Sequence, residues 1–261
     1  MIFLKANFHT HTYRCNHAVG EDREYVLKAI ERGVESLGFS DHSPYCFPDG
    51  YYSGFRMTLD QVAGYVRSLS ELREEFKDKI RIYIGYEMEY YPAYFERTIN
   101  DVILKNGCDY IILGQHFIDN EIGQHPCATP TDDAKRLENY VDTLIEGINT
   151  GRYFYVAHPD VLNFTGDTDV YREQVTRLCK EAKRLGVPLE YNVLGVKDGR
   201  FYPVDEFWRV AAAVGNKVII GCDAHRPDDV ANSEFLEKTM QKADALGLDI
   251  IEPVEPTFIT R

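Results

Sequence analysis

The sequence lacks several features that would place it in well-known classes of protein. It has six cysteines but no CxxC pair, which favours reduced thiols over a disulfide framework. No window approaches the roughly 18 uninterrupted apolar residues of a transmembrane helix. The first residues, MIFLKANFHTHTYRCNH, turn polar too soon for a secretory signal. We therefore expect a cytoplasmic protein.

Basic residues are also in the minority, with 29 Lys and Arg against 42 Asp and Glu and a net charge of -13. Such an acidic chain is not expected to bind nucleic acid or an anionic membrane surface, because both favour basic partners. A small anionic substrate is still compatible, since bound metal ions can invert the local field. We expect a small-molecule partner, and the sequence leaves the oligomeric state open.

What the chain does contain is a recurring unit, in which an amphipathic stretch ends at a glycine and an apolar run follows. Apolar residues spaced by three and four indicate helices, and glycine is a common residue just past a helix end. The runs that follow are rich in Val, Ile, Tyr and Phe, as in strands buried on both faces of a parallel sheet. The glycines that end the helical stretches are Gly33, Gly107, Gly151, Gly186 and Gly215.

Two further strands are expected at Ile2–Phe8 and Ile80–Glu87, which makes seven strands alternating with seven helices. A weak eighth run lies near Leu248–Ile251. Repeated strand–helix units predict an α/β protein with a parallel sheet, either closed as a barrel or open and doubly wound. With 261 residues and 44% hydrophobic content, the chain can form one large core, so we expect a single domain over residues 1–261.

Possible metal ligands stand at the ends of six of the expected strands. Residues i and i+2 of a strand point the same way, so His9 with His11, and Asp223 with His225, can each aim two ligands at one place. His17 follows in the loop after the first strand. In barrel enzymes, the carboxyl ends of the strands form the active site. The strand-end set is His9, His11, Asp41, His42, Glu87, His116, His158, Asp223 and His225.

A single histidine near a strand end is more often a hydrogen-bonded structural residue than a ligand. Seven of the eight histidines on one rim are much harder to explain without a cation, because neutral imidazoles and carboxylates are costly to bury unpaired. The donor types suit Zn, Mn or Fe rather than Ca or Mg, with Zn favoured. The number of donors implies two or three divalent ions, with Glu87 as a bridging carboxylate. His125, in an irregular loop, is expected to be structural or solvated.

These residues resemble the markers of the PHP (polymerase and histidinol phosphatase) superfamily. The markers are HTH at 9–11, SDH at 40–42, GYE at 85–87, QH at 115–116, AHP at 157–159 and DAH at 223–225. The similarity spans about residues 3 to 230. It implies a distorted TIM-like barrel of seven βα units and a metal-dependent phosphoesterase with three ions.

The resemblance implies a ligand group for each of three ions, with Glu87 shared between the first two. The first would be bound by His9, His11, Glu87 and Asp223, the second by Glu87, His116 and His158, and the third by His17, His42 and His225. The implied chemistry is attack on phosphorus by a water that the cations have acidified. The candidates for protonating the leaving oxygen are Asp223, His225 and His17. Asp41 is either an orienting partner of a histidine ligand or a turn residue.

Within the superfamily, the segments SDHSPYCFPDG and LEYN look most like the stand-alone histidinol-phosphatases. Those enzymes often carry a short stretch with threonine or serine and an arginine after the sixth strand, where this chain has NVLGVKDGR. Lys197 or Arg200 could replace that arginine, and Arg56 is a third candidate for binding phosphate. Glu190 and Asn192 are expected on the same rim, where they recognise the substrate amine or satisfy local backbone groups.

The expected reaction is therefore hydrolysis of L-histidinol phosphate, a step of histidine biosynthesis. A related phosphatase could instead hydrolyse a nucleotide or phosphotyrosine with the same chemistry, and a related nuclease would trim DNA. A non-catalytic metal-binding or scaffold protein would bind ions without hydrolysis. A metal-dependent amidohydrolase also uses HxH on a barrel, but it usually needs a lysine at a middle strand end, which this chain lacks.

Overall fold

The computed structural model describes residues 4–48, 51–253 and 255–256, and every strand pair in it is parallel. One sheet has the order β1-β2-β3-β4, and a second has the order β5-β6-β7. The strands are β1 (Ala6–Asn7), β2 (Ser36–His42), β3 (Arg81–Glu87), β4 (Tyr110–Ile112), β5 (Leu189–Asn192), β6 (Lys217–Gly221) and β7 (Asp249–Ile250). Residues 2 and 3 of the first expected strand lie outside the described residues.

Two narrow contacts join the two sheets into a distorted barrel. Val156 forms parallel bridges to Leu113, after β4, and to Leu189 at the start of β5. Thr10, after β1, forms a parallel bridge to Ala224, after β6. The strand expected around Val156 is thus reduced to isolated bridges. The weak eighth run is present as β7, which pairs with the start of β6. The expected α/β barrel fold is confirmed.

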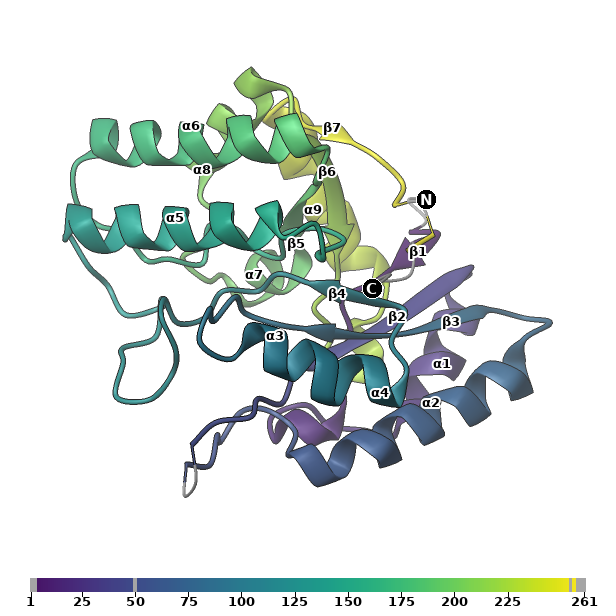
Figure 1. Ribbon diagram of the computed structural model, residues 1–261. Coiled ribbons are helices and arrows are strands. Elements are labelled where there is room, and N and C mark those ends of the chain that lie inside the picture. Colours follow the sequence, from purple (N-terminus) through teal and green to yellow (C-terminus); the bar gives the residue numbers. More distant parts are fainter. Residues whose placement is uncertain (1–3, 49–50, 254, 257–261) are drawn as a thin grey trace.

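The helices lie outside this sheet, with α5 and α6 side by side on one flank and α1 and α2 on another (Figure 1). Gly186 and Gly215 adopt positive φ at the ends of α6 and α8, as expected for helix stops. A π-helical turn at Ile99–Ile103 joins α3 to α4. The helices are α1 (Asp22–Glu31), α2 (Val62–Phe76), α3 (Phe95–Thr98), α4 (Leu104–Asn106), α5 (Ala134–Asn149), α6 (Thr168–Leu185), α7 (Val193–Asp198), α8 (Asp205–Val214) and α9 (Ser233–Ala245).

A small apolar cluster, separate from the main core, fills the inside of the barrel. Tyr110 is its centre, and its hydroxyl donates a hydrogen bond to the carbonyl of Phe8 at 2.9 Å. Gly38 and Gly85 make room for the Tyr110 ring, because a Cβ at either position would overlap it. The cluster consists of Ala6, Phe8, Tyr110, Ile112, Tyr155, Ala157 and Ile219. This packed floor leaves the carboxyl ends of the strands as the open face of the barrel.

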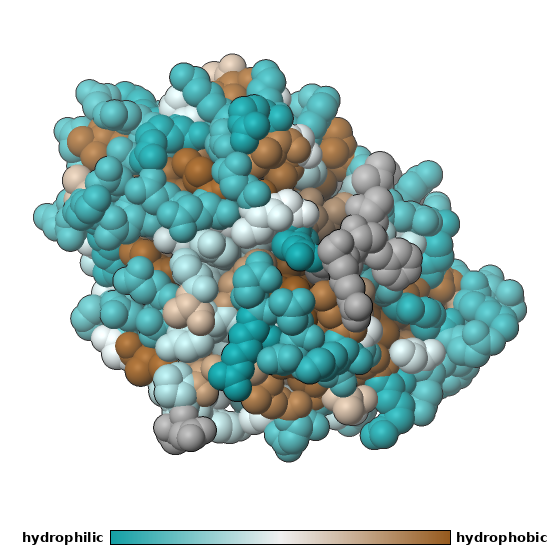
Figure 2. Space-filling view, in the orientation of Figure 1, coloured by the Kyte–Doolittle hydropathy of each residue, from teal (hydrophilic) through white to brown (hydrophobic). Residues whose placement is uncertain are grey.

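Within the described residues, no helix is long and apolar enough to span a membrane. The face shown in Figure 2 is mostly hydrophilic, with smaller hydrophobic areas between the polar side chains. All six cysteines are in the described part of the chain and are free thiols, as expected.

Candidate metal centre

The strand-end histidines and carboxylates converge on Glu87, the last residue of β3. His158 Nε2 lies 2.7 Å from Glu87 Oε1, and His116 Nε2 lies 3.5 Å from the same oxygen. On the other side, His42 Nδ1 is 3.1 Å from Oε2. Glu87 is 1% exposed, so it stands at the centre of the cluster with ligands on both sides. This position suits the bridging role expected for it.

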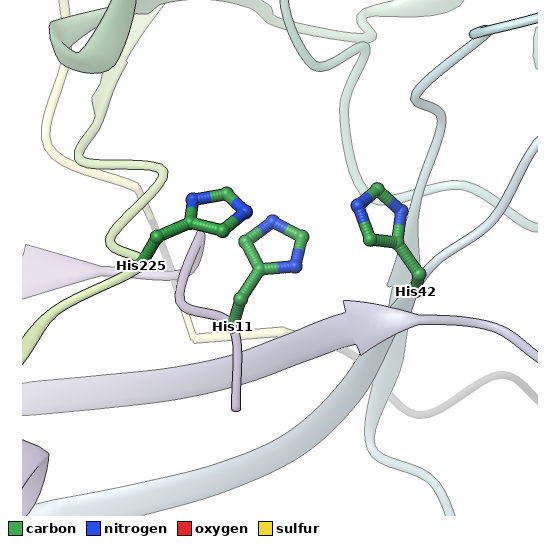
Figure 3. Close-up of side chains that lie close together, drawn as sticks. All are labelled: His11, His42 and His225. Carbon is green, nitrogen blue, oxygen red and sulfur yellow. The ribbon is translucent and has the colours of Figure 1, made fainter. Parts of the chain in front are cut away.

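Asp223 forms a second centre beside Glu87. His11 Nε2 lies 3.1 Å from Asp223 Oδ1, and His9 Nε2 lies 3.5 Å from the same atom. The rings of His11, His42 and His225 face one another across a common space (Figure 3). His17 joins them, with its ring centroid 4.8 Å from that of His225. All nine residues expected as ligands are therefore gathered at one end of the barrel.

Several of these rings are held by a partner on the nitrogen that faces away from the cluster. Glu190 Oε2 lies 2.8 Å from Nδ1 of His9, and Glu89 Oε1 lies 3.0 Å from Nδ1 of His116. Asp41 Oδ1 is 3.5 Å from Nδ1 of His11. Such contacts fix the ring orientation and leave Nε2 to face the cluster, as is usual for metal-binding histidines.

The donor atoms themselves fit cations. Nε2 of His9, Nε2 of His11, Oε2 of Glu87 and Oδ1 of Asp223 are buried without a hydrogen-bond partner. Leaving so many polar atoms unpaired in one place costs free energy, because each has lost its contact with water. Divalent cations bound between imidazole nitrogens and carboxylate oxygens would satisfy all of them, and this donor set suits Zn, Mn or Fe.

The protonation states in the metal-free protein reflect the same crowding. Burial lowers the pKa of His9, but Glu190, Asp223 and Glu87 outweigh it and raise that pKa to about 10. Burial raises the pKa of Glu87, but His116, His42 and His9 hold it well below its usual range. Burial also lowers the pKa of His225 to about 3, which keeps that imidazole neutral. Glu87 is thus ionised, as a carboxylate that binds a metal must be.

Two of the ligand candidates also have strained backbones. His158 and Asp223 adopt positive φ, at 28° and 50°. This region is uncommon for residues other than glycine, and such strain tends to persist at functional sites. At Gly114, by contrast, only glycine fits, because a Cβ there would overlap the Glu87 carboxylate. The backbone conformation at His158 and Asp223 and the missing side chain at Gly114 therefore all accommodate the cluster.

A cavity of about 870 Å³ opens onto the cluster, within the size range of small-molecule sites. Phe55 and Phe117 stack at its rim, with ring centroids 5.9 Å apart. Lys197 and Arg200, on and just after α7, also line it. Lys197 pairs with Asp229 at 2.8 Å, and the Arg200 guanidinium contacts the Tyr202 hydroxyl at 2.9 Å. The cavity thus joins the metal donors to two cationic side chains.

Two of the expected substrate contacts are placed differently. Arg56 is 2% exposed and does not line the cavity, because its guanidinium is held by Glu89 and Glu121. Glu190 is fully buried beneath His9, where Asn192 donates to it at 2.7 Å. We therefore no longer expect Arg56 to bind phosphate or Glu190 to bind the substrate.

The remaining sequence candidates have local roles. Thr12 donates a hydrogen bond to Asp41, so Asp41 bridges that threonine and His11. His125 is exposed, and its backbone carbonyl accepts a hydrogen bond from Arg136. Two residues of the site were not expected from the sequence. Glu89 contacts His116, and Cys15 lies within reach of His17 and His225. Glu89 could have been found by its i+2 spacing from Glu87.

Comparison with known proteins places this geometry in a family context. The family model described as PHP domain matches residues 7–193 of the chain. A protein described as a probable histidinol-phosphatase from Deinococcus radiodurans is 28% identical over 228 residues, covering 85% of this chain and 86% of its own length. The histidinol-phosphatase of Bacillus subtilis is 25% identical over 270 residues, covering 90% of this chain and 99% of its own length.

A solved structure shows the same fold. The crystal structure of histidinol phosphate phosphatase from Lactococcus lactis, complexed with zinc, L-histidinol and phosphate, matches with a TM-score of 0.74. The identity is 22%, and each chain is covered completely. The barrel architecture is therefore shared over the whole length of both chains.

Proposed function

We propose, since the chain belongs to the PHP domain family, that it is a metal-dependent phosphomonoesterase that hydrolyses L-histidinol phosphate to L-histidinol and phosphate. The observation that carries the proposal is the convergence of unpaired buried donors on Glu87 and Asp223 at the floor of a small-molecule cavity. The curated relatives named as histidinol-phosphatases support the choice of substrate. We treat residues 1–261 as one phosphoesterase domain.

We assign the metal ligands in three groups around the two carboxylates. Bound there, two or three divalent ions, with zinc favoured, would acidify a water and neutralise charge on the phosphoryl oxygens. The ligand groups are His9, His11, Glu87 and Asp223; Glu87, His116 and His158; and His17, His42 and His225.

The chain's own side chains would bind and orient the ester. Lys197 and Arg200 line the cavity and would pair with the phosphate, as cationic donors do. The stacked rings of Phe55 and Phe117 would cover the organic part of the substrate and exclude water. Asp223, His225 and His17, the three candidates for protonating the leaving oxygen, also line the cavity, and each would act as an acid only when it is not bound to a metal ion.

The test is steady-state kinetics on L-histidinol phosphate beside a nucleotide, phosphotyrosine and an aryl phosphate, with metal content measured on the same sample. We expect the highest kcat/KM for L-histidinol phosphate. A chelator should abolish turnover, and zinc or manganese should restore it. Glu87→Ala should lose nearly all activity on every ester. A higher kcat/KM for another ester would identify that ester as the preferred substrate. Full activity of Glu87→Ala would refute the metal-dependent reaction.

A further inference from the structure

The cation Arg56, expected at the substrate, lies instead in a buried network with Glu89 and Glu121. All five of its N–H groups are used: two contact Glu89 at 3.0 and 3.1 Å, two contact Glu121 at 2.6 and 3.1 Å, and one donates to the Ser43 carbonyl at 2.7 Å. The three charged side chains are each no more than 5% exposed. We call Arg56, Glu89 and Glu121 the Arg56 network.

The network carries one positive and two negative charges, so one negative charge is left over. Glu89 contacts His116 through the same Oε1 that Arg56 holds. A buried carboxylate beside Nδ1 favours the tautomer that carries its proton there. Nε2 is then free for a metal. The network therefore faces His116 with an anion that Arg56 keeps in place.

The same network ties together two long loops at the cavity rim. Arg56 belongs to the loop between β2 and α2, and Glu121 belongs to the loop between β4 and α5. The Arg56 guanidinium lies 4.3 Å from the Phe55 ring centroid, and that ring lies 5.3 Å from the His42 ring. Phe55 in turn stacks on Phe117 of the second loop. The rim aromatics are thus anchored to the same guanidinium as the His116 partner.

We propose that Glu89 and Arg56 are positioning residues that couple the cavity rim to the metal ligand His116. Glu89 sets the orientation and tautomer of His116, whereas the contact between Arg56 and Glu121 holds the two loops together. The inference rests on the proposed function only through its metal site, so metal binding alone can test it.

The chain offers a matched pair of variants. Glu89→Gln and Glu121→Gln each remove one carboxylate charge from Arg56, keep the side-chain size and leave the guanidinium with one anion. Only Glu89 contacts His116. Zinc affinity, measured by competition with a chelator, should fall about 10- to 100-fold in Glu89→Gln, the usual effect of removing an outer-shell partner. Zinc affinity of Glu121→Gln should stay close to wild type.

Two further measurements complete the test: the spectrum of bound cobalt, and the rate at which a protease cleaves the loop at the cavity rim. The visible spectrum of the cobalt-loaded protein should change in Glu89→Gln and not in Glu121→Gln. Limited proteolysis between residues 117 and 131 should accelerate in Glu121→Gln. If Glu89→Gln does not fold, Arg56→Lys replaces it; this variant keeps the charge with fewer donors, and we expect weaker zinc binding and faster cleavage.

Equal zinc affinity in all the folded variants would overturn the inference, and so would an equal loss in Glu89→Gln and Glu121→Gln. If the wild-type protein binds zinc but hydrolyses no phosphate ester, the proposed function fails while this comparison still stands.

Discussion

Glu190 holds His9 from beneath the metal cluster, with Oε2 of the glutamate 2.8 Å from Nδ1 of the histidine and both side chains fully buried. Gly221 makes this possible, because a Cβ at that position would overlap the Glu190 carboxylate. The pair places a fixed negative charge behind a ligand, and this charge controls the proton on the ligand.

Metal uptake should therefore release protons. In the metal-free protein the pKa of His9 is raised to about 10, so His9 is protonated at neutral pH and a metal must displace that proton. The charged form stabilises the metal-free fold fully below the usual pKa of about 6.5, and this stabilisation is lost as the pH rises through about 10. Zinc affinity should rise with pH, and a zinc titration in weak buffer should acidify the solution.

In Glu190→Gln, the zinc titration should release fewer protons, because the neutral partner no longer raises the pKa of His9. Glu138→Gln, at a partly exposed glutamate of α5 that is paired with Lys135, is the control and should match wild type. Equal release from Glu190→Gln and wild type would contradict the role assigned to Glu190.

Gly114→Ala should disable the site without changing a ligand. The added methyl would displace the Glu87 carboxylate, so we expect less than the wild-type metal content and a large loss of turnover. Gly64→Ala in α2 is the matched control, because nothing lies within 4 Å of a Cβ there. The control should be neutral or more stable by about 0.5–1 kcal/mol. Normal metal content in Gly114→Ala would show that Glu87 can bind ions from another position.

Lys197→Gln and Arg200→Gln should each raise KM for the phosphate ester and leave metal content unchanged. A hydrogen bond to a charged group contributes about 1.5–3 kcal/mol, which corresponds to roughly ten- to a hundredfold in KM where KM reports binding. Lys180→Gln, at an exposed position of α6, should behave as wild type. Unchanged KM in both cavity variants would remove these two cations from the phosphate site.

Asp160 gives a pH-dependent prediction for stability. Burial raises its pKa to about 6, although Val204 N–H and the Trp208 indole donate to it. The folded state therefore holds the Asp160 proton more tightly than the unfolded state. Its contribution to stability falls from about pH 4 to above pH 6, by about 3 kcal/mol in total.

Asp160→Asn keeps an acceptor oxygen and carries no charge. In urea unfolding of equally metal-loaded proteins, the stability of the variant relative to wild type should grow from pH 5 to pH 8. A pH-independent difference would show that Asp160 titrates near its usual pKa.

The sequence predicts that the strand-end side chains converge, because the carboxyl ends of parallel strands must meet at one edge of the sheet. His9, His116 and Asp223 could be placed together without any coordinates. The expected strand around Val156 is an instructive exception. Its apolar run is largely buried, but Val156 alone forms bridges to both neighbouring segments, and the residues around it are not paired as a regular strand.

The roles of Arg56 and Glu190 could not be predicted, because a position near the rim does not identify the partner that a side chain contacts. Arg56 meets Glu121, 65 residues away, and Glu190 meets His9, 181 residues away. A cationic side chain near an active-site motif indicates phosphate binding only when it is not already paired with a buried carboxylate, as Arg56 is. Gly114 is a similar case, because its lack of a side chain has meaning only beside Glu87.

The bridge between Thr10 and Ala224 closes the barrel with the two segments that carry His9, His11, Asp223 and His225. The backbone N–H of His11 donates to the carbonyl of Ala224 at 2.9 Å. The contact that closes the barrel therefore also brings these four side chains together. A nascent chain leaving the ribosome cannot make this contact until residue 225 has emerged. The full set of donors at this end of the barrel therefore cannot assemble until the segment around residue 224 has paired with the segment around residue 10.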